Sequence, residues 1–384
     1  MPTQEQKINL IARTEAGLKD AALDELKTKN IISNASRITF LKQKNFDLLF
    51  IQNCNKPILS KTPLYTIDQI LIPIIYGRFK ISKNQLNQLT DYLKKQTGAW
   101  RLVTTADGAH FNRKLMAQWL TRQLKERKVF LENQANSKQL HSKIKSPANH
   151  QDKISELWFF LIDENFYVAS QLFRSDTLPH RQQRIAERQG SLQPTIAAAI
   201  YYLTKTKITA PTILDPCCGT GTLLSETLAQ SPLAKVIGID IDPQATKAAI
   251  QNLQNFKQQT LILRANSSKI PLNSNIVDLV ISNFPFGKQF GAPETNPELY
   301  FNILNECARV TKNNSQLVIL TSDENAITSS VNQLNLSIKK KIKVKTQGLW
   351  SLLFFLEKKK SKQKKNQYPS HNHNLHTNLT TNNT

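Results

Sequence analysis

The chain has 384 residues, with 51 lysines and arginines against 28 aspartates and glutamates, a formal net charge of +23. This length predicts two or three domains at roughly 100–200 residues each, and the basic balance favours a polyanionic partner. The first ten residues show no basic segment followed by an apolar one, and the longest apolar runs are far shorter than a membrane span. We therefore expect neither a secretory signal nor a membrane-spanning segment.

The surplus of positive charge lies mainly in two stretches. Residues 77–128 carry 12 basic and 3 acidic side chains, and residues 339–365 carry 11 lysines and one glutamate. Each stretch alone is equally compatible with an ordinary solvated face. Two such clusters in one chain favour a nucleic acid as the partner.

The four cysteines, Cys54, Cys217, Cys218 and Cys307, form neither a CxxC pair nor a zinc-ligand spacing. A disulfide between the neighbours Cys217 and Cys218 would be strained. The pattern predicts reduced thiols without a bound metal, and therefore a cytoplasmic protein.

The first half of the chain mixes strands and helices and contains no glycine-rich motif. Alternating or apolar runs predict strands at 7–15, 46–52, 63–76, 100–106, 157–163 and 165–173. Helical spacing predicts helices at 16–29, 83–96 and 111–128. The last two strands are expected to form a hairpin with its turn at 163–165, and the polar residues 132–151 a loop. This half is therefore α+β, and it shows no recognisable chemistry.

The helix expected at 111–128 is amphipathic and basic. We expect Leu115, Trp119 and Leu120 to point inward, with the arginines elsewhere on the helix. After it, residues 174–190 are charged and rich in arginine, which predicts a connector that can touch substrate. Residues 191–203 then begin a helix, with Pro194 in its first turn.

From residue 212 onward, strands and helices alternate strictly. Strands are predicted at 212–216, 234–240, 260–265, 277–282 and 316–322, with helices between them. One of these helices has Asp242 as its N-cap and Pro243 at its first position. This rhythm predicts a parallel, doubly wound sheet.

The end of the pattern differs from its beginning. Residues 338–348 and 349–358 read as two strands joined by a glycine-containing turn, and so predict an antiparallel hairpin at the edge of the sheet. Alternating lysines along the first of them protect an exposed edge from aggregation. The lysine-rich and then polar residues that follow are expected to be disordered.

The segment LDPCCGTGT, at 214–222, lies between a predicted strand and a predicted helix. Gly219 and Gly221 allow the backbone to approach a ligand closely. Asp215, directly before the glycines, would repel a pyrophosphate but suits a cationic ligand that carries an amino group and a sulfonium, as S-adenosylmethionine does. No GK[ST] follows the loop, and GxGxxG is absent, which excludes a P-loop and argues against a nicotinamide oxidoreductase.

Two further polar residues end the next strands in the right order for a nucleoside. Asp240 can accept both ribose hydroxyls, as acids do at this position in nucleoside-binding doubly wound folds. Asn266 can offer its side-chain oxygen to the adenine amino group. Each residue alone could simply cap a helix, but the ordered set favours a cofactor site.

The segment SNFPFG, at 282–287, follows the fourth strand and so shares the crevice with the glycine loop. One interpretation is purely structural: a tight turn whose apolar side chains pack into the core. The functional reading is a grip on an exocyclic amine: the Asn283 side chain and the Phe284 carbonyl accept its two N–H bonds. Pro285 holds Phe284 extended, and Phe286 stacks on the base. Neither a metal nor a general base is required, because placement of an activated methyl group supplies most of the rate.

These motifs resemble those of a known family. LDPCCGTGT, GIDID and SNFPFGKQFG are similar to the signature of class I methyltransferases that modify exocyclic amines, and SNFPFGK in particular to that of THUMP-domain guanine-N2 methyltransferases acting on tRNA. SLQPTIAAAI is similar to the helix that precedes their cofactor loop. The first half resembles the family more loosely, and the resemblance covers about residues 1–358.

The resemblance implies an architecture in five parts. A Rossmann-like class I methyltransferase domain, mostly parallel with an antiparallel C-terminal hairpin, is expected after an α+β half made of a ferredoxin-like part and a THUMP domain. The implied boundaries are 1–60 for the ferredoxin-like part, 61–174 for THUMP, 175–190 for a linker, 191–358 for the methyltransferase and 359–384 for a tail.

The resemblance also implies the site. The residues expected at the cofactor are Thr195, Asp215, Cys217, Gly219, Gly221, Asp240, Ile241 and Asn266. Those expected to act on the target base are Asn283, Phe284, Pro285 and Phe286, and those expected to contact the nucleic acid are Arg113, Lys114, Arg122 and Lys288. Two positions depart from the family: Asn266 stands where Asp is frequent, and Phe284 where Pro or Leu is.

The implied reaction is transfer of a methyl group from S-adenosylmethionine to the 2-amino group of a guanine in tRNA, flipped out of its stem. The partner is then RNA, with no obligate protein partner evident. Guanine in 23S ribosomal RNA, adenine in DNA and glutamine in a protein are alternative substrates. A non-catalytic RNA-binding protein with a degenerate methyltransferase domain is the alternative from another class.

Overall fold

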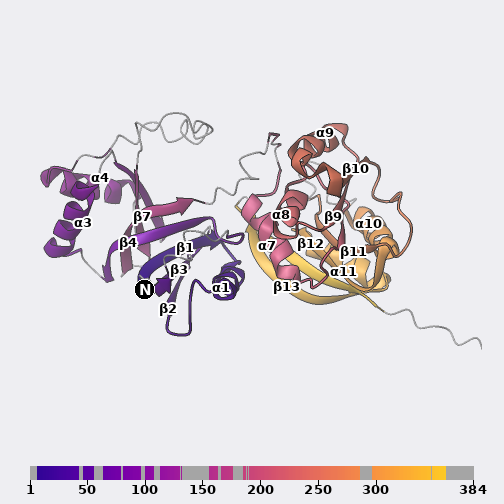
Figure 1. Cartoon of the computed structure of the whole chain (residues 1–384), viewed down its shortest axis with the longest axis horizontal. Helices are drawn as coiled ribbons and strands as arrows, with labels where there is room; N and C mark the ends of the chain where they lie inside the picture. The colour runs from indigo at the N-terminus through magenta and orange to yellow at the C-terminus, as the bar shows by residue number, and fades with distance from the viewer. Residues whose placement is uncertain are drawn as a thin grey trace, which may run out of the picture.

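The computed structural model describes residues 7–42, 46–55, 64–78, 81–96, 100–107, 113–129, 131, 155–162, 166–175, 185–186, 188, 190–285, 296–346 and 348–359. Two halves lie side by side, each built on a seven-stranded sheet (Figure 1). Among the described residues, no helix is both long enough and apolar enough to cross a membrane.

The N-terminal half is one continuous sheet with the order β2-β3-β1-β4-β7-β6-β5. Its strands are β1 (Lys7–Glu15), β2 (Arg37–Lys42), β3 (Phe46–Asn55), β4 (Gln69–Arg78), β5 (Trp100–Asp107), β6 (Ser155–Ile162) and β7 (Phe166–Ser175). All neighbours run antiparallel except β5 and β6, which are parallel. The expected hairpin of β6 and β7 is confirmed, while β2 was not predicted. Because β1 pairs with β4, the sheet crosses the expected boundary at residue 60, which stays a prediction.

The helices that cover this sheet in the described part of the chain are α1 (Lys19–Thr28), α3 (Lys83–Lys95) and α4 (Arg113–Glu126). Helix α3 begins at a capping box, in which Ser82 and Gln85 each satisfy the other's backbone N–H. Helices α3 and α4 lie at the end of the molecule farthest from the second half (Figure 1), whereas α1 lies beside that half.

The prediction of which α4 residues point inward is wrong for two of the three residues. Leu115 and Trp119 are 62% and 42% exposed, and only Leu120 is buried. Ala117, Leu120 and Leu124 form the buried stripe instead. Successive helical residues point about 100° apart, so Trp119 and Leu120 cannot share the centre of one face.

The C-terminal half is a doubly wound sheet with the order β10-β9-β8-β11-β12-β14-β13. Its strands are β8 (Thr212–Asp215), β9 (Lys235–Asp240), β10 (Thr260–Arg264), β11 (Val277–Asn283), β12 (Thr311–Thr321), β13 (Leu336–Thr346) and β14 (Leu349–Lys358). The first five strands are parallel, and β14 and β13 add an antiparallel hairpin with β13 at the edge. The predicted Rossmann-like fold and the lysine-rich edge strand are confirmed.

Helices cover both faces of this sheet, which explains why its central strands are continuously apolar. They are α7 (Pro194–Thr204), α8 (Thr222–Gln230), α9 (Pro243–Asn252), α10 (Asn296–Val310) and α11 (Glu324–Gln333), with a short 3-10 helix, η2 (Gln254–Gln259). Asp242 caps α9 by accepting from the Gln244 N–H at 2.8 Å, and Pro243 follows, as expected. Asp323 caps α11 in the same way.

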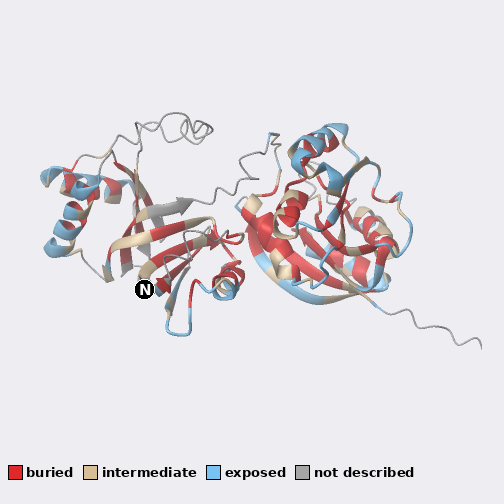
Figure 2. Ribbon diagram, viewed as in Figure 1, coloured by how far each residue is buried: buried red, intermediate tan, exposed pale blue. Residues whose placement is uncertain are grey.

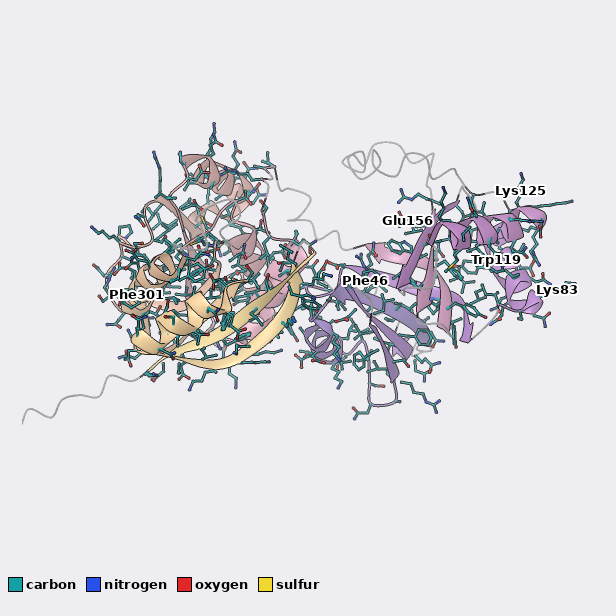
Figure 3. The ribbon with its side chains drawn as sticks, turned by 180° about the vertical axis from the view of Figure 1, so that it is seen from behind. Phe46, Lys83, Trp119, Lys125, Glu156 and Phe301 are labelled. Atoms are coloured by element: carbon teal, nitrogen blue, oxygen red, sulfur yellow. The ribbon has the colours of Figure 1, made fainter. Side chains whose placement is uncertain are left out.

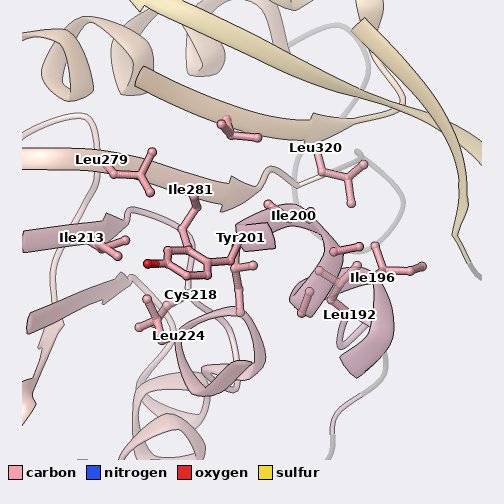
Figure 4. Close-up of a cluster of buried hydrophobic side chains, with 14 of the residues drawn as sticks. Leu192, Ile196, Ile200, Tyr201, Ile213, Cys218, Leu224, Leu279, Ile281 and Leu320 are labelled. Carbon is pink, nitrogen blue, oxygen red and sulfur yellow. The ribbon is translucent and has the colours of Figure 1, made fainter. Parts of the chain in front are cut away.

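Two apolar clusters fill the space between the sheet and its helices (Figure 2). The cluster on the α7 and α8 side brings Ile196 and Ile200 of α7 against Ile213, Ile281 and Leu320 of the central strands (Figure 4). Its members are buried, so helix α7 is part of the hydrophobic core of the C-terminal half.

The two halves meet through α1, β1, α7 and β13. The Lys345 N–H donates to the Ala16 carbonyl at 2.9 Å, and the Tyr65 hydroxyl donates to the Ala229 carbonyl at 3.3 Å. A Cβ on Gly17, whose φ is +96°, would lie 2.0 Å from the Lys343 carbonyl oxygen. Strand β13 therefore lies directly on the turn between β1 and α1.

Several expectations fall on residues outside those described. They are the loop at 132–151, the turn at 163–165, most of the linker at 175–190 and the tail after residue 359.

Candidate functional site

A cavity of about 620 Å³ opens at the carboxyl ends of β8, β9 and β11. This is the edge at which doubly wound sheets bind ligands. Its lining comes from the glycine loop, from residues 188–193 before α7, from α10 and from the end of the β13–β14 hairpin. The cavity therefore joins segments that are more than 150 residues apart in the chain.

The two glycines of the loop have different roles. A methyl group placed on Gly219 would project into open space, with no heavy atom within 4 Å. Gly219 also has φ +53°, which L side chains rarely adopt. A Cβ on Gly221 would lie 2.9 Å from the Leu253 side chain, so Gly221 allows α9 to pack against the start of α8. Gly219 faces the cavity, and Gly221 supports it from behind.

Asp215 lies at the floor of this site and is 1% exposed. One of its oxygens accepts from the Ser282 hydroxyl at 2.6 Å and from the Cys217 N–H at 3.1 Å. Burial raises the pKa of Asp215 to about 7, although these two hydrogen bonds oppose the rise and the nearby Asp240 adds to it. A cationic group in the cavity would favour the ionised form.

Asp240 ends β9 with both oxygens aligned by backbone N–H groups. One accepts from Gly219 and the other from Asp242, each at 2.9 Å. A carboxylate oxygen has more than one lone pair, so each can still accept a hydroxyl proton. The next residue, Ile241, is exposed and also lines the cavity. This arrangement suits the two hydroxyls of a ribose.

Asn266 also lines the cavity, with its side-chain oxygen accepting from the Ser268 N–H at 2.9 Å. That oxygen is therefore fixed in place and retains a second lone pair for a ligand. Cys217 lines the cavity as well. Burial raises the pKa of the Cys217 thiol well above its usual value. The thiol therefore stays protonated and is unsuited to nucleophilic chemistry. The described residues contain no cluster of His, Cys, Asp and Glu that could hold a metal.

Asn283 ends β11 at the cavity with an unsatisfied acceptor. Its Oδ1 atom is buried and has no hydrogen-bond partner among the described residues. A buried, unpaired polar atom costs about 1–3 kcal/mol, so native structures keep few of them. An N–H donor of a bound substrate would satisfy it.

The two residues after Asn283 are held by the core. Phe284 buries its ring against Tyr300, with centroids 5.1 Å apart, and its N–H donates to the Leu320 carbonyl at 3.0 Å. The Tyr300 hydroxyl donates to the Pro285 carbonyl at 2.7 Å. The side chain of Phe284 therefore anchors the turn, which leaves its backbone to face the cavity. Phe286 and Lys288 lie outside the described residues.

Sequence reasoning missed Tyr300. It belongs to the apolar stripe of α10, and nothing in its local sequence separates it from a core aromatic residue. The sheet order is what brings α10 beneath the turn after β11.

Asn252, at the end of α9, was also missed. Its side-chain oxygen accepts from the N–H groups of Ile185 and Ala186, and its amide donates to the carbonyls of Ala186 and Thr220, all at 2.9 Å. All four hydrogen-bonding positions of the side chain are used. Asn252 therefore ties the segment before α7 to the glycine loop.

The tied segment carries Arg188 to the cavity. Its guanidinium donates to Asp242 at 2.6 Å and holds the pKa of that carboxyl below its usual range. Ser191 lies 3.2 Å from the Thr220 hydroxyl, which adds a second link to the loop. The connector at 174–190 was expected to touch substrate, and two of its described residues, Arg188 and Gly190, line the cavity.

Thr195 is placed differently from what the family resemblance implies. It is buried in the first turn of α7, and its hydroxyl donates to Asp68 of the N-terminal half. It is not among the residues that line the cavity. In this structure its visible role is to join the two halves.

Two of the residues expected to contact nucleic acid lie on helix α4, far from the cavity. Lys114 and Arg122 are exposed on α4, at the distal end of the molecule, where Trp119 and Lys125 also lie (Figure 3). Arg122 pairs with Glu126 at 3.0 Å. Any role for them is in binding an extended partner rather than in chemistry. The side chain of Arg113 is outside the described part of the structure.

The sheet order, the glycine loop and the polar carboxyl-terminal edge define a class I methyltransferase domain. Residues 181–351 match the model of the UPF0020 family, described as an RMKL-like methyltransferase domain. Its cofactor is S-adenosylmethionine, and the residues present fit it: open space above Gly219, a buried acid for its cationic part, and an aligned acid for its ribose.

Curated relatives match parts of the chain. The U6 snRNA (guanine-N(2))-methyltransferase THUMPD2 of Bos taurus is 31% identical over 139 residues, which are 36% of this chain and 27% of that protein. The tRNA (guanine(6)-N2)-methyltransferase of Methanocaldococcus jannaschii is 22% identical over 218 residues, 47% of this chain and 57% of that protein. The matches thus span less than two thirds of the length of these relatives.

Among solved structures, TrmN from Thermus thermophilus is similar over 91% of this chain and 99% of its own, with a TM-score of 0.69 and 18% identity. At this identity the likeness concerns the fold alone. It extends across both halves of the chain.

Proposed function

We propose that the protein transfers a methyl group from S-adenosylmethionine to the exocyclic 2-amino group of a guanine in RNA, with tRNA as the substrate. The observation that carries the proposal is the buried Oδ1 of Asn283, which has no hydrogen-bond partner among the described residues and lies at the cavity that Asp215 and Gly219 also line. An amide oxygen needs an N–H donor, and an exocyclic amine on a flat base supplies one.

The cofactor would lie between the glycine loop and the ends of β8 and β9. Asp215 would hold its ammonium group, Asp240 its ribose hydroxyls and Asn266 its adenine amino group. When bound, S-adenosylmethionine supplies a methyl group already activated on its sulfonium. The protein therefore needs to bind and orient rather than to provide a nucleophile.

The turn after β11 would hold the base. Asn283 accepts one N–H of the amine, and the Phe284 carbonyl accepts the other. These two hydrogen bonds localise the nitrogen lone pair and direct it towards the methyl group. Tyr300 keeps the turn in place through Pro285.

RNA as the substrate is supported by the charge and by the relatives. The chain carries a net charge of +23, which suits a polyanion and argues against a protein substrate. The two curated relatives described above are guanine-N2 methyltransferases of U6 snRNA and of tRNA. We propose residues 61–174 as a THUMP RNA-binding domain beside a ferredoxin-like part at 1–60, and the cytoplasm, where cysteines stay reduced, as the location.

A methyl-transfer assay tests the proposal. The full chain would be incubated with labelled S-adenosylmethionine and bulk tRNA, ribosomal RNA or DNA, followed by mass spectrometry of the nucleosides. We expect N2-methylguanosine in tRNA. Label only in ribosomal RNA or in DNA adenine would contradict the proposed substrate, and cofactor binding without any transfer would contradict the enzyme.

A further inference from the structure

Gln193 brings a second unsatisfied acceptor to the cavity. Its Oε1 atom is buried and has no hydrogen-bond partner among the described residues, and Gln193 is part of the cavity lining. Of the described residues whose buried side-chain atoms lack a partner, Gln193 and Asn283 are the two that line the cavity. A buried acceptor without a donor is costly and therefore rare, which points to a donor that a ligand brings.

The Gln193 side chain does not cap helix α7. Gln193 is the residue directly before the first turn of α7, where a Ser, Thr, Asp or Asn side chain usually accepts from a helix N–H. The Gln193 side chain makes no such hydrogen bond. Its backbone serves the helix instead, since its carbonyl accepts from the Ala197 N–H at 3.0 Å. Capping therefore does not explain why an amide oxygen is buried here.

The beginning of α7 and the Asn283 side chain lie on the same face of the sheet. Asn283 pairs with Leu320 of β12, and paired residues of neighbouring parallel strands point to the same face. Leu320 packs in one apolar cluster with Ile196, which is three residues after Gln193 and also lines the cavity (Figure 4). One cavity therefore receives an unsatisfied acceptor from the start of this helix and another from the end of β11.

Guanine has donors for both acceptors. Guanine, adenine and cytosine each carry an exocyclic amine, but only in guanine does a ring nitrogen next to that amine, N1, carry a hydrogen. The ring nitrogen next to the amine is N1 in adenine and N3 in cytosine, and each of these has a lone pair instead. Enzymes that act on a flipped base read it through hydrogen bonds to this edge. A second acceptor beside the one that holds the amine therefore favours guanine and repels the other two bases.

We propose that Gln193 selects guanine as the target base: its Oε1 accepts the N1–H of guanine while Asn283 holds the neighbouring 2-amino group. This inference rests on the proposed function and deepens it, because it states how the cavity distinguishes guanine from adenine. With adenine bound, Oε1 faces the lone pair of N1 and stays unsatisfied. A site that hydrogen-bonds a substrate N–H rejects an analogue without it far more strongly than an apolar pocket does.

The test compares two nucleotides that both carry a 2-amino group. Guanosine 5′-monophosphate has the N1–H, whereas 2-aminopurine riboside 5′-monophosphate has a lone pair at N1. Ligand-observed NMR titration would give the Kd of each for the full chain saturated with S-adenosylhomocysteine.

The variants separate the acceptor from the packing of the side chain. Gln193→Met keeps the length of the side chain without an acceptor, and Gln193→Glu keeps an acceptor. Gln230→Met is the matched control. The Gln230 amide donates to the Ala198 carbonyl of α7 at 2.9 Å, and Gln230 is not among the residues that line the cavity.

We expect the unchanged protein to bind the guanosine nucleotide about 10-fold or more tightly than the 2-aminopurine nucleotide, the order of one buried hydrogen bond. Gln193→Met should abolish this preference by weakening the guanosine nucleotide alone, whereas Gln193→Glu and Gln230→Met should keep it. The affinity of Gln193→Met for S-adenosylhomocysteine, measured by calorimetry, should stay within about twofold, because the amide contacts the base and not the cofactor.

Three results would overturn the inference. They are the absence of a guanosine preference in the unchanged protein, a preference that persists in Gln193→Met, and a loss of cofactor affinity in Gln193→Met as large as the loss of guanosine affinity. Because the readout needs no methyl transfer, it separates the two proposals. A guanosine preference that depends on Gln193 in a protein that methylates no RNA would leave the selection of guanine standing and refute the reaction. N2-methylguanosine formed by a protein whose preference does not depend on Gln193 would do the reverse.

Discussion

The two halves of the molecule differ in how they use polar residues. In the C-terminal half, a few polar groups are buried at one edge of the sheet: Asp215 is 1% exposed, and Asn283 holds a buried acceptor. In the N-terminal half, helices α3 and α4 carry exposed basic residues at the far end, among them Lys83, Arg122 and Lys125. A buried, hydrogen-bonded polar group has one position and can perform chemistry. An exposed lysine or arginine has many positions and contributes charge.

The comparison predicts that single changes at the edge of the catalytic sheet abolish activity. Asn283→Ala should lower the rate of methyl transfer by about 10³-fold, because it removes an acceptor aimed at the reacting amine. Cofactor affinity should stay within about twofold. Single-turnover kinetics and calorimetry measure the two quantities.

Asn266→Ala is the matched control for this change, since it should raise the cofactor Kd and leave the single-turnover rate at saturation nearly unchanged. Equal loss of rate and cofactor affinity in Asn283→Ala would contradict its assignment to the substrate.

The second prediction tests whether activity on RNA depends on the contact between the two halves. Gly17→Ala should force the halves apart, because its Cβ would lie 2.0 Å from the Lys343 carbonyl oxygen. We expect activity on RNA to fall by about 10-fold or more while cofactor affinity is retained, since positioning errors of about 1 Å are costly.

Gly348→Ala controls for backbone strain. Gly348 also has a positive φ, +85°, but nothing lies within 4 Å of its Cβ. Both variants therefore carry a backbone strain of about 1 kcal/mol from the positive φ. Only Gly17→Ala also places its Cβ against the Lys343 carbonyl oxygen. Similar activities in the two would show that the contact between the halves does not matter for RNA methylation.

The buried acid predicts how cofactor binding depends on pH. In the free protein the pKa of Asp215 is raised to about 7, so the carboxyl is mostly neutral below that pH. A cationic ligand requires the carboxylate, and binding therefore releases a proton. Affinity should fall about tenfold per pH unit below 7 and level off above it.

Stability of the free protein should change in the opposite direction. A group whose folded pKa is raised contributes stability at low pH that is lost as the pH rises through 7. Calorimetry in buffers of different ionisation enthalpy measures the released proton, and thermal unfolding measures stability. Asp215→Asn should flatten both profiles, and a tenfold slope that persists in this variant would contradict the role of Asp215.

The smallest expected effect concerns the tie beneath the glycine loop. Asn252→Asp keeps the acceptor to Ile185 and Ala186 but loses both donors, including the one to Thr220. The loop should loosen, so the KM for the cofactor should rise several-fold while kcat changes little. Steady-state kinetics at saturating RNA checks this, with Asn255→Asp, in η2 outside the tie, as the control. An unchanged KM would show that the loop is rigid without the tie.

Much of the fold could be predicted because its signals are local. The strands of the C-terminal half are short apolar runs bounded by turns, and Asp242 with Pro243 marks a helix start. The prediction was wrong on α4, where Leu115 and Trp119 are exposed. A basic helix with apolar residues on two faces does not reveal which face meets the sheet. That choice depends on the neighbours it packs against.

The residues of the candidate site also differ in whether their local sequence could predict them. Asp215, Gly219, Asp240 and Asn283 each lie within a few residues of a strand end, and strand ends of a parallel sheet meet at one edge. The sequence by itself therefore determined that the glycine loop and the turn after β11 meet at one cavity, and their roles towards cofactor and base stay predictions. Backbone geometry over a few residues is enough to place them.

Only the tertiary structure decided which distant segments complete the site. Tyr300 beneath the turn and Asn252 behind the glycine loop come from segments whose local sequences look like ordinary core and an ordinary helix end. Thr195 faces Asp68 rather than the cavity for the same reason. Such contacts join residues tens to more than a hundred positions apart, and they arise from the packing of whole elements against one another.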